Sequence, residues 1–170
     1  MKHIILIGFM GSGKTSLGSR LAKAMKRSFV DTDERIVKES GMTVEEIFRQ
    51  EGEVGFRRRE TESLRNLLKE SEPAVISVGG GLPVQPENHL LLQQLGTVIY
   101  LQTSLETLKQ RLAGSTGRPL LKGQDLEARI RELMDQREEI YQEVADLFVD
   151  TDGKTFRELI SEIENRLEYR

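Results

Sequence analysis

The sequence contains no cysteine, which excludes a disulfide framework and a thiolate metal site. It has no apolar run approaching the ~18 residues of a membrane span, because the stretch from Ile4 to Ile7 stops at Gly8. It also has no excess of positive charge. The 25 Lys and Arg against 28 Asp and Glu give a net charge of -3, whereas a nucleic-acid-binding domain usually carries a basic face. These absences predict a cytoplasmic protein that binds neither a membrane nor nucleic acid.

The chain also lacks internal repeats, low-complexity segments and a proline-rich linker. Its 170 residues match one domain of ordinary size, long enough to bury a substantial core. We therefore expect a single domain over residues 1–170, and we expect it to act as a monomer.

Short apolar runs alternate with longer amphipathic stretches along the chain. The apolar runs predict strands at residues 3–7, 28–31, 74–78, 97–101 and 147–149. The amphipathic stretches predict helices at residues 15–25, 43–50, 53–70, 86–94, 104–112, 126–144 and 155–167. Since the strands do not alternate with period two, they indicate a parallel sheet covered by helices on both faces. The predicted fold is a three-layer α/β/α sandwich around a five-stranded parallel sheet.

The first strand is followed by a glycine-rich loop, Gly8-Phe-Met-Gly-Ser-Gly-Lys-Thr15, which fits the pattern G-x-x-x-x-G-K-[ST]. The loop lies between a strand and a helix, which is the context that a phosphate-binding loop requires. Glycines let backbone N–H groups turn toward an anion, and the helix N-terminus adds about half a positive charge. Lys14 can reach the β- and γ-phosphates, and the Thr15 hydroxyl can bind Mg²⁺. The alternative, a plain glycine-rich turn, is disfavoured by the flanking strand and helix.

Two carboxylates, Asp31 and Asp33, follow the predicted second strand. A phosphoryl-transfer enzyme needs an acid near its metal ion, and the third strand ends in glycine and supplies none. Asp150, after the last strand, is a weaker candidate because it lies near the C-terminus. We therefore assign Asp31 to Mg²⁺ and Asp33 to an acceptor hydroxyl, which it would orient or deprotonate. The alternative is that both residues form only a turn and a helix cap.

Arginines and glycines mark three further segments. Arg57 and Arg58 lie on a predicted helix, and either could bind a substrate carboxylate; periodicity alone does not choose between them. The glycines at 79–81 follow a strand and would let a ligand contact the backbone. Residues 112–124 look like a lid, with Arg118 available to stabilise the transferring phosphoryl group. The alternative for this segment is a surface loop with a solvated arginine.

Together these segments resemble the shikimate kinase family over nearly the whole chain. The matching segments are Gly8-Phe-Met-Gly-Ser-Gly-Lys-Thr-Ser16, Asp31-Thr-Asp33, Gly52-Glu-Val-Gly-Phe-Arg57 with Glu60, Gly79-Gly-Gly81, Arg118-Pro-Leu-Leu121, and Arg137 with Tyr141. The phosphate loop alone is common to many families, whereas the combination is specific. The resemblance implies a P-loop fold like that of nucleoside-monophosphate kinases, with a substrate-binding region at residues 33–60 and a lid at residues 112–124.

The resemblance also implies a reaction and a role for each site residue. The reaction would be ATP-dependent phosphorylation of the 3-hydroxyl of shikimate, with Mg²⁺ as cofactor, giving shikimate 3-phosphate and ADP in the chorismate pathway of aromatic amino-acid biosynthesis. The catalytic residues would be Lys14, Asp33 and Arg118. ATP would be bound by Gly11, Ser12, Gly13, Lys14, Thr15, Ser16, Arg111, Arg118 and Lys154. Shikimate would be bound by Asp33, Arg57, Gly79, Gly80, Gly81 and Arg137, and Mg²⁺ by Thr15 and Asp31.

Two alternatives stay open at this point. The same kinase fold could act on gluconate or on a nucleoside monophosphate, although paired carboxylate-binding arginines favour a small acid. The chain could instead be an ATP-binding sensor without catalysis. Such a protein would be expected to lack Lys14, Asp33 or the lid arginine, and all three are present.

Overall fold

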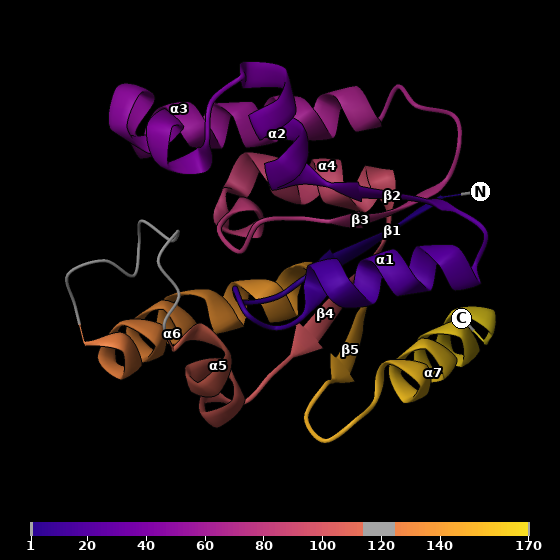
Figure 1. Ribbon diagram of the computed structural model, residues 1–170. Helices are drawn as coiled ribbons and strands as arrows, with labels where there is room; N and C mark the ends of the chain where they lie inside the picture. Colours follow the sequence, from indigo (N-terminus) through magenta and orange to yellow (C-terminus); the bar gives the residue numbers. More distant parts are fainter. Residues whose placement is uncertain (1, 114–124, 170) are drawn as a thin grey trace.

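The structure is a computed structural model that describes residues 2–113 and 125–169. Its elements are β1 (His3–Ile7), α1 (Lys14–Ala24), β2 (Ser28–Asp31), α2 (Thr32–Ser40), α3 (Val44–Leu67), β3 (Ala74–Ser77), the 3₁₀ helix η1 (Leu82–Val84), α4 (Pro86–Leu95), β4 (Gly96–Gln102), α5 (Leu105–Leu112), α6 (Leu126–Val144), β5 (Leu147–Asp150) and α7 (Phe156–Glu168) (Figure 1). Within the described residues, the five strands form one parallel sheet in the order β2-β3-β1-β4-β5. The predicted parallel sheet is confirmed.

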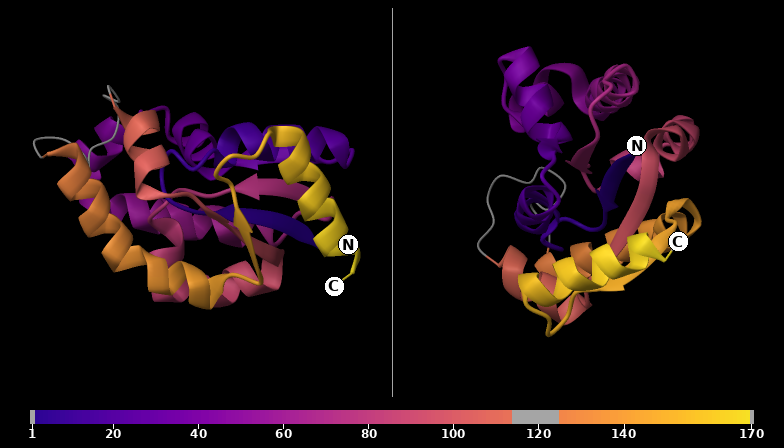
Figure 2. Two further views of the ribbon diagram at one scale, coloured as in Figure 1. Left: turned by 90° about the horizontal axis from the view of Figure 1, so that it is seen from below. Right: turned by 90° about the vertical axis from the view of Figure 1, so that its right-hand side faces the viewer.

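Strand β1 lies at the centre of the sheet and is buried on both faces. Ile5 and Ile7 pack in one core with side chains of α3, α4 and α6, whereas Ile4 and Leu6 pack in a second core with α1 and α7. Figure 2 shows the sheet between these two helical layers. An apolar strand without period-two alternation is the pattern that burial on both faces requires, so the predicted three-layer fold is confirmed.

Two smaller apolar clusters lie beyond the carboxyl ends of the strands. Ile36 of α2 packs against Ile47 and Phe56 of α3. On the other side, Phe9 packs against residues of α5 and α6. Figure 1 shows α2 and α3 above and α5 and α6 below the carboxyl end of β1, so the strand ends face the space between the two groups. No helix in this described part of the chain is both long and apolar enough to cross a membrane.

Most predicted element boundaries lie within two residues of those observed, but two elements were not predicted. The short η1 was missed, and α2 was missed because its only buried apolar side chain is Ile36. The start of α2 is fixed by Asp31, whose side chain accepts hydrogen bonds from the backbone N–H groups of residues 33 and 34. The predicted break near Gly52 is confirmed, because that residue has φ 72° and ψ -178° inside α3. The predicted end of this helix, Glu70, was wrong, since the helix stops at Leu67.

Candidate active site

The phosphate loop joins β1 to α1 at the carboxyl end of the central strand. Gly11 and Gly13 have φ values of 84° and 95°, a region that glycine adopts readily, and Gly13 directly precedes the first helical residue. The Lys14 ammonium donates to the carbonyl oxygens of Gly8 at 2.7 Å and Phe9 at 3.0 Å. The Ser12 hydroxyl is buried and has no hydrogen-bond partner among the described residues. The loop therefore combines a helix N-terminus, a lysine and an unused hydroxyl at one point, which suits a phosphate.

Asp31 connects the loop to α2 through its two carboxylate oxygens. Oδ1 accepts the backbone N–H groups of Asp33 at 2.9 Å and Glu34 at 3.2 Å, and Oδ2 accepts the Thr15 hydroxyl at 2.9 Å. The cap that was weighed as an alternative is therefore present, together with the predicted proximity of Asp31 and Thr15. Hydroxyl and carboxylate oxygens are the hard donors that Mg²⁺ prefers. No group of three or more His, Asp or Glu is placed to hold a metal among the described residues, so phosphates and water would complete such a site.

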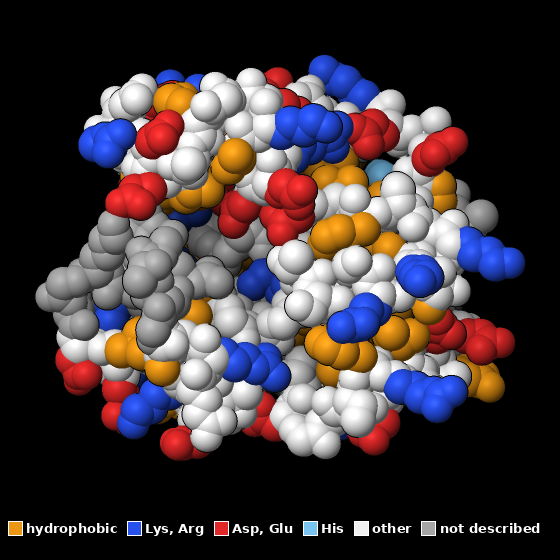
Figure 3. Space-filling view, in the orientation of Figure 1, with side chains coloured by type: hydrophobic (Ala, Val, Ile, Leu, Met, Phe, Trp, Pro, Cys, Tyr) orange, Lys and Arg blue, Asp and Glu red, His pale blue; other side chains and the backbone are white. Residues whose placement is uncertain are grey.

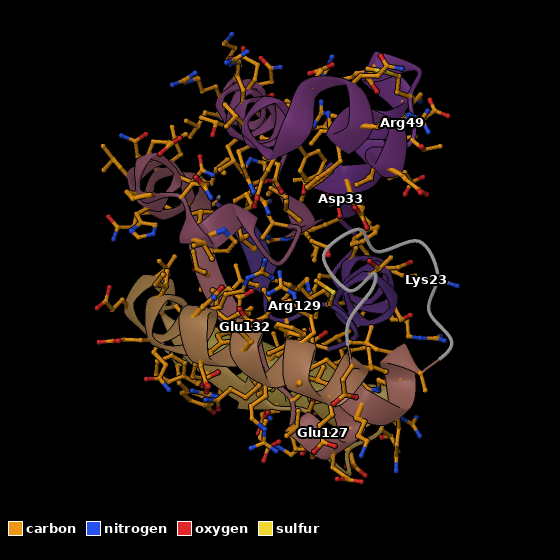
Figure 4. All side chains as sticks on the ribbon, turned by 90° about the vertical axis from the view of Figure 1, so that its left-hand side faces the viewer. Lys23, Asp33, Arg49, Glu127, Arg129 and Glu132 are labelled. Atoms are coloured by element: carbon orange, nitrogen blue, oxygen red, sulfur yellow. The ribbon has the colours of Figure 1, made fainter. Side chains whose placement is uncertain are left out.

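Asp33 lines a cavity of about 270 Å³ at the carboxyl ends of the strands. The cavity is lined by the three segments that the sequence placed at strand ends: the phosphate loop, the aspartates after β2 and the glycines after β3. Figure 3 shows the hollow, with acidic side chains on its upper rim and a basic side chain in its depth. Figure 4 shows Asp33 at the start of α2, on the side of the α2–α3 part that faces α6. The predicted convergence of these segments is thus observed.

The glycines at 79–81 are required by close contacts rather than by backbone conformation. None of the three has a φ in the left-handed range between +20° and +160°. A Cβ on Gly79 would lie 2.9 Å from Asp33 Oδ1. A Cβ on Gly80 would lie 3.0 Å from Arg137 Nη1, and one on Gly81 would lie 2.3 Å from Arg57 Nη2. Each glycine therefore leaves room for a different predicted site side chain, which brings Asp33, Arg57 and Arg137 around one short backbone segment.

Of the two arginines that periodicity left open, the structure places Arg57 in the site. Arg57 is 9% exposed and lies against Gly81, whereas Arg58 is exposed. The Arg57 guanidinium donates to Glu60 at 2.6 Å and to Glu53 at 3.1 Å. Burial raises the pKa of the Glu60 carboxyl to about 7, and the neighbouring Arg57 opposes part of that shift. Arg57 is thus held by a buried carboxylate at the edge of the glycine segment.

Arg137 approaches the same glycines from α6. It is 5% exposed, its guanidinium lies 5.8 Å from the centre of the Phe9 ring, and its Nη1 atom has no hydrogen-bond partner among the described residues. A buried guanidinium with an unused donor favours an anionic ligand, because a buried donor without a hydrogen-bond partner is costly. The geometry therefore suits a carboxylate held near Arg57 and Arg137.

A second cavity, of about 480 Å³, lies on the other side of the phosphate loop. Arg111, Gly13 and Ser16 line both cavities, so the two are neighbours. The Arg111 guanidinium donates to the Gly11 carbonyl at 2.9 Å. Lys154 also lines this cavity, with its ammonium 3.2 Å from Glu162. These positions suit the adenosine part of a nucleotide whose phosphates occupy the loop. Arg118 and most of the predicted lid at 112–124 lie outside the described residues.

Comparison with known proteins identifies the family. A protein-family model described as shikimate kinase matches residues 10–168 of this chain. A curated shikimate kinase from Francisella tularensis subsp. novicida is 39% identical over 166 residues, which cover 98% of this chain and 94% of the relative. This chain belongs to the shikimate kinase family.

Solved structures of shikimate kinases agree with that assignment. The Acinetobacter baumannii shikimate kinase in complex with shikimate is 38% identical, with a TM-score of 0.94 over 99% of this chain and 94% of the other. The Bacteroides thetaiotaomicron shikimate kinase is 29% identical, with a TM-score of 0.88 over 98% of both chains. The predicted family and the predicted P-loop kinase fold are confirmed.

Two buried side chains of this shikimate kinase family member had no role assigned from sequence. The Tyr141 hydroxyl donates to the carbonyl oxygen of Gly80. Glu60 was noted as part of a motif, but its ion pair with Arg57 was not anticipated. A signal was available, because residues 57, 60, 61 and 64 share one helix face, and two charged residues on a buried face indicate a paired site.

Proposed function

We propose that this protein transfers the γ-phosphoryl group of ATP to the 3-hydroxyl of shikimate, giving shikimate 3-phosphate and ADP in the pathway to chorismate. One observation carries the proposal: a carboxylate, Asp33, and two buried arginines, Arg57 and Arg137, meet around residues 79–81 beside a phosphate-binding loop. Family membership and the relative solved with bound shikimate support the identity of the acceptor. A nucleotide acceptor would instead need a pocket that reads a base.

The acceptor would be bound through its carboxylate and oriented through its hydroxyls. Arg57 and Arg137 would hold the carboxylate, since both guanidinium groups are buried and face the glycine segment. Asp33 would accept a hydrogen bond from the 3-hydroxyl and either orient that group or take its proton as the new P–O bond forms. Such a site works mainly by positioning the two reactants.

The donor would be bound along the phosphate loop. Backbone N–H groups of residues 11–16 and the Lys14 ammonium would surround the β- and γ-phosphates, and Arg111 and Lys154 would flank the adenosine. Thr15 and Asp31 would hold Mg²⁺, which when bound neutralises charge on the phosphates. The family resemblance assigns Arg118 to the transferring phosphoryl group.

An ADP-release assay with several acceptors tests the proposal. Shikimate at millimolar concentration should cause ATP consumption, whereas gluconate and CMP should not. Removal of divalent metal with EDTA should abolish turnover, and added Mg²⁺ should restore it. The proposal fails if shikimate causes no ATP consumption, and turnover on gluconate or CMP alone would move the protein to a different acceptor class.

Substitution of Asp33 separates catalysis from nucleotide binding. Asp33→Asn keeps the size of the side chain but removes its charge, so turnover should fall by about 10²- to 10⁴-fold while ATP binding stays intact. The matched control is Glu34→Gln, one residue further along α2, where the side chain is exposed. ATP binding with no turnover in the unmodified protein would point to a non-catalytic sensor.

A further inference from the structure

Glu60 is the most deeply buried acidic side chain of the site, and only one of its two carboxylate oxygens has a hydrogen-bond partner among the described residues. It lies on α3, one turn after Arg57, and is 0% exposed. Its Oε1 atom accepts the Arg57 guanidinium at 2.6 Å. Its Oε2 atom is buried and has no hydrogen-bond partner among the described residues. An unpaired carboxylate oxygen in such a position is costly while the group is charged, and it calls for a proton or a ligand.

Three charged groups face Glu60 from three different elements. Arg57 lies on its own helix, Asp33 comes from α2 and Arg137 from α6. Glu60 Oε2 lies 3.0 Å from the point that a Cβ on Gly79 would occupy, and Asp33 Oδ1 lies 2.9 Å from the same point. The two carboxylates therefore flank Gly79, which lines the cavity.

Two other ionisable groups border this cluster. The pKa of the Tyr141 hydroxyl is raised by burial to about 12, so this group stays neutral. Glu53 also accepts from Arg57, at 3.1 Å, but its side chain is 55% exposed and its charge is screened by water. The cluster thus contains two cations, Arg57 and Arg137, and two carboxylates, Glu60 and the partly buried Asp33, and its charges balance.

Binding of an acidic substrate would change the charge balance of this cluster. A substrate carboxylate held by Arg57 and Arg137 would add one negative charge beside the buried Glu60 carboxyl. Protein sites avoid such a net buried charge by taking up a proton on the group that is hardest to keep ionised. Asp33 is only partly buried, whereas Glu60 is fully buried with an unpaired oxygen. Burial already raises the pKa of Glu60 to about 7, and the nearby Asp33 adds to that shift.

We propose that Glu60 takes up a proton from solvent when the substrate carboxylate docks between Arg57 and Arg137, so that acid binding and protonation of this buried side chain are coupled. The inference rests on the function proposed above and adds to it a proton-linked positioning residue that acts through Arg57. The proton goes to Oε2, Oε1 keeps the hydrogen bond from Arg57, and no other bond changes. Since the protonated form binds the acid better, shikimate affinity should weaken by up to about tenfold per pH unit above the pKa of Glu60.

Calorimetric titration of shikimate into the protein measures this coupling directly. Titrations at about pH 7.5 in buffers with different ionisation enthalpies give the number of protons exchanged. The wild type should take up between about one half and one proton per shikimate bound. Glu60→Gln should bind shikimate with no proton uptake and with an affinity that does not change between about pH 6.5 and 8.5.

The matched control is Glu53→Gln, which removes the other carboxylate partner of Arg57. Because Glu53 is exposed, this variant should keep the proton uptake of the wild type. Binding of shikimate to the wild type without proton uptake would overturn the inference, as would an equal uptake in Glu60→Gln. If Glu60→Gln does not fold or bind, the pH dependence of the wild-type dissociation constant decides: a flat profile overturns the inference. Failure of wild-type protein to bind shikimate at all would instead refute the proposed function.

Discussion

Replacement of Gly81 by alanine tests whether the glycine segment exists to admit Arg57. Gly81 has φ -89° and ψ -12°, values that alanine adopts without strain, so the substitution adds a methyl group and little else. That methyl would lie 2.3 Å from Arg57 Nη2 and 2.5 Å from its Cζ atom. Ordinary contacts are about 3.5–4 Å, so the guanidinium must move by more than 1 Å or the backbone must shift.

The energetic cost of Gly81→Ala follows from the contacts that Arg57 would lose. Its 2.6 Å hydrogen bond to Glu60 joins two charged groups in a buried place, and such a bond contributes about 1.5–3 kcal/mol. If the displaced guanidinium also misses the substrate carboxylate, kcat/KM for shikimate should fall by about 10- to 100-fold, since ~1.4 kcal/mol is tenfold. The KM for ATP should not change, because the phosphate loop lies outside these contacts.

Steady-state kinetics with each substrate varied in turn gives both constants, and a thermal melt checks that the variant is folded. Gly80→Ala is the matched control, because the same methyl one residue earlier meets Arg137 Nη1 at 3.0 Å and should cost less. The decisive test is Gly81→Ala in an Arg57→Ala background. If the methyl acts through Arg57, it should have little further effect there. A full additional loss in that background would refute the steric explanation.

Two further predictions concern stability. His3 Nδ1 accepts the Ala74 N–H at 3.0 Å, and burial lowers the pKa of this imidazole below 6.5. The contribution of His3 to stability is therefore present above about pH 6.5 and is lost as pH falls through the lowered pKa. Urea unfolding should therefore show the advantage of the wild type over His3→Asn shrinking between neutral pH and about pH 5, and a constant difference would contradict this reasoning. Gly18→Ala would place a Cβ 2.6 Å from the Phe29 ring and should lower the free energy of unfolding by about 1–3 kcal/mol. The control is Ser19→Ala, on the exposed face of the same helix, which should change the free energy of unfolding by less than about 0.5 kcal/mol.

The sequence predicted the sheet and the phosphate loop well because both depend on local patterns. The strands could be found as apolar runs, and the loop could be found because glycines, a lysine and a hydroxyl must follow one another to surround a phosphate. Helix α2 was missed for the opposite reason. Its single buried apolar side chain, Ile36, gives almost no periodic signal, and the helix depends on a cap and on packing against α3.

Within the site, the sequence identified which residue types converge but not how they are paired. Arg57 and Arg58 could not be separated by periodicity, and contacts with Glu60 and Gly81 decide between them. The glycines at 79–81 were expected to admit a ligand. The structure adds that they admit side chains from α2, α3 and α6, a relation between elements far apart in sequence that no local pattern contains.

Asp31 shows why two interpretations of one residue need not compete. A helix cap and a metal ligand were weighed as alternatives, but a carboxylate has two oxygens and each can serve one purpose. Oδ1 is occupied by two backbone N–H groups at the start of α2, which fixes the orientation of the side chain. Oδ2 then points to the Thr15 hydroxyl across the mouth of the phosphate loop. The cap therefore positions the oxygen that would bind the metal, and the same helix start places Asp33, two residues later, among the residues that line the 270 Å³ cavity.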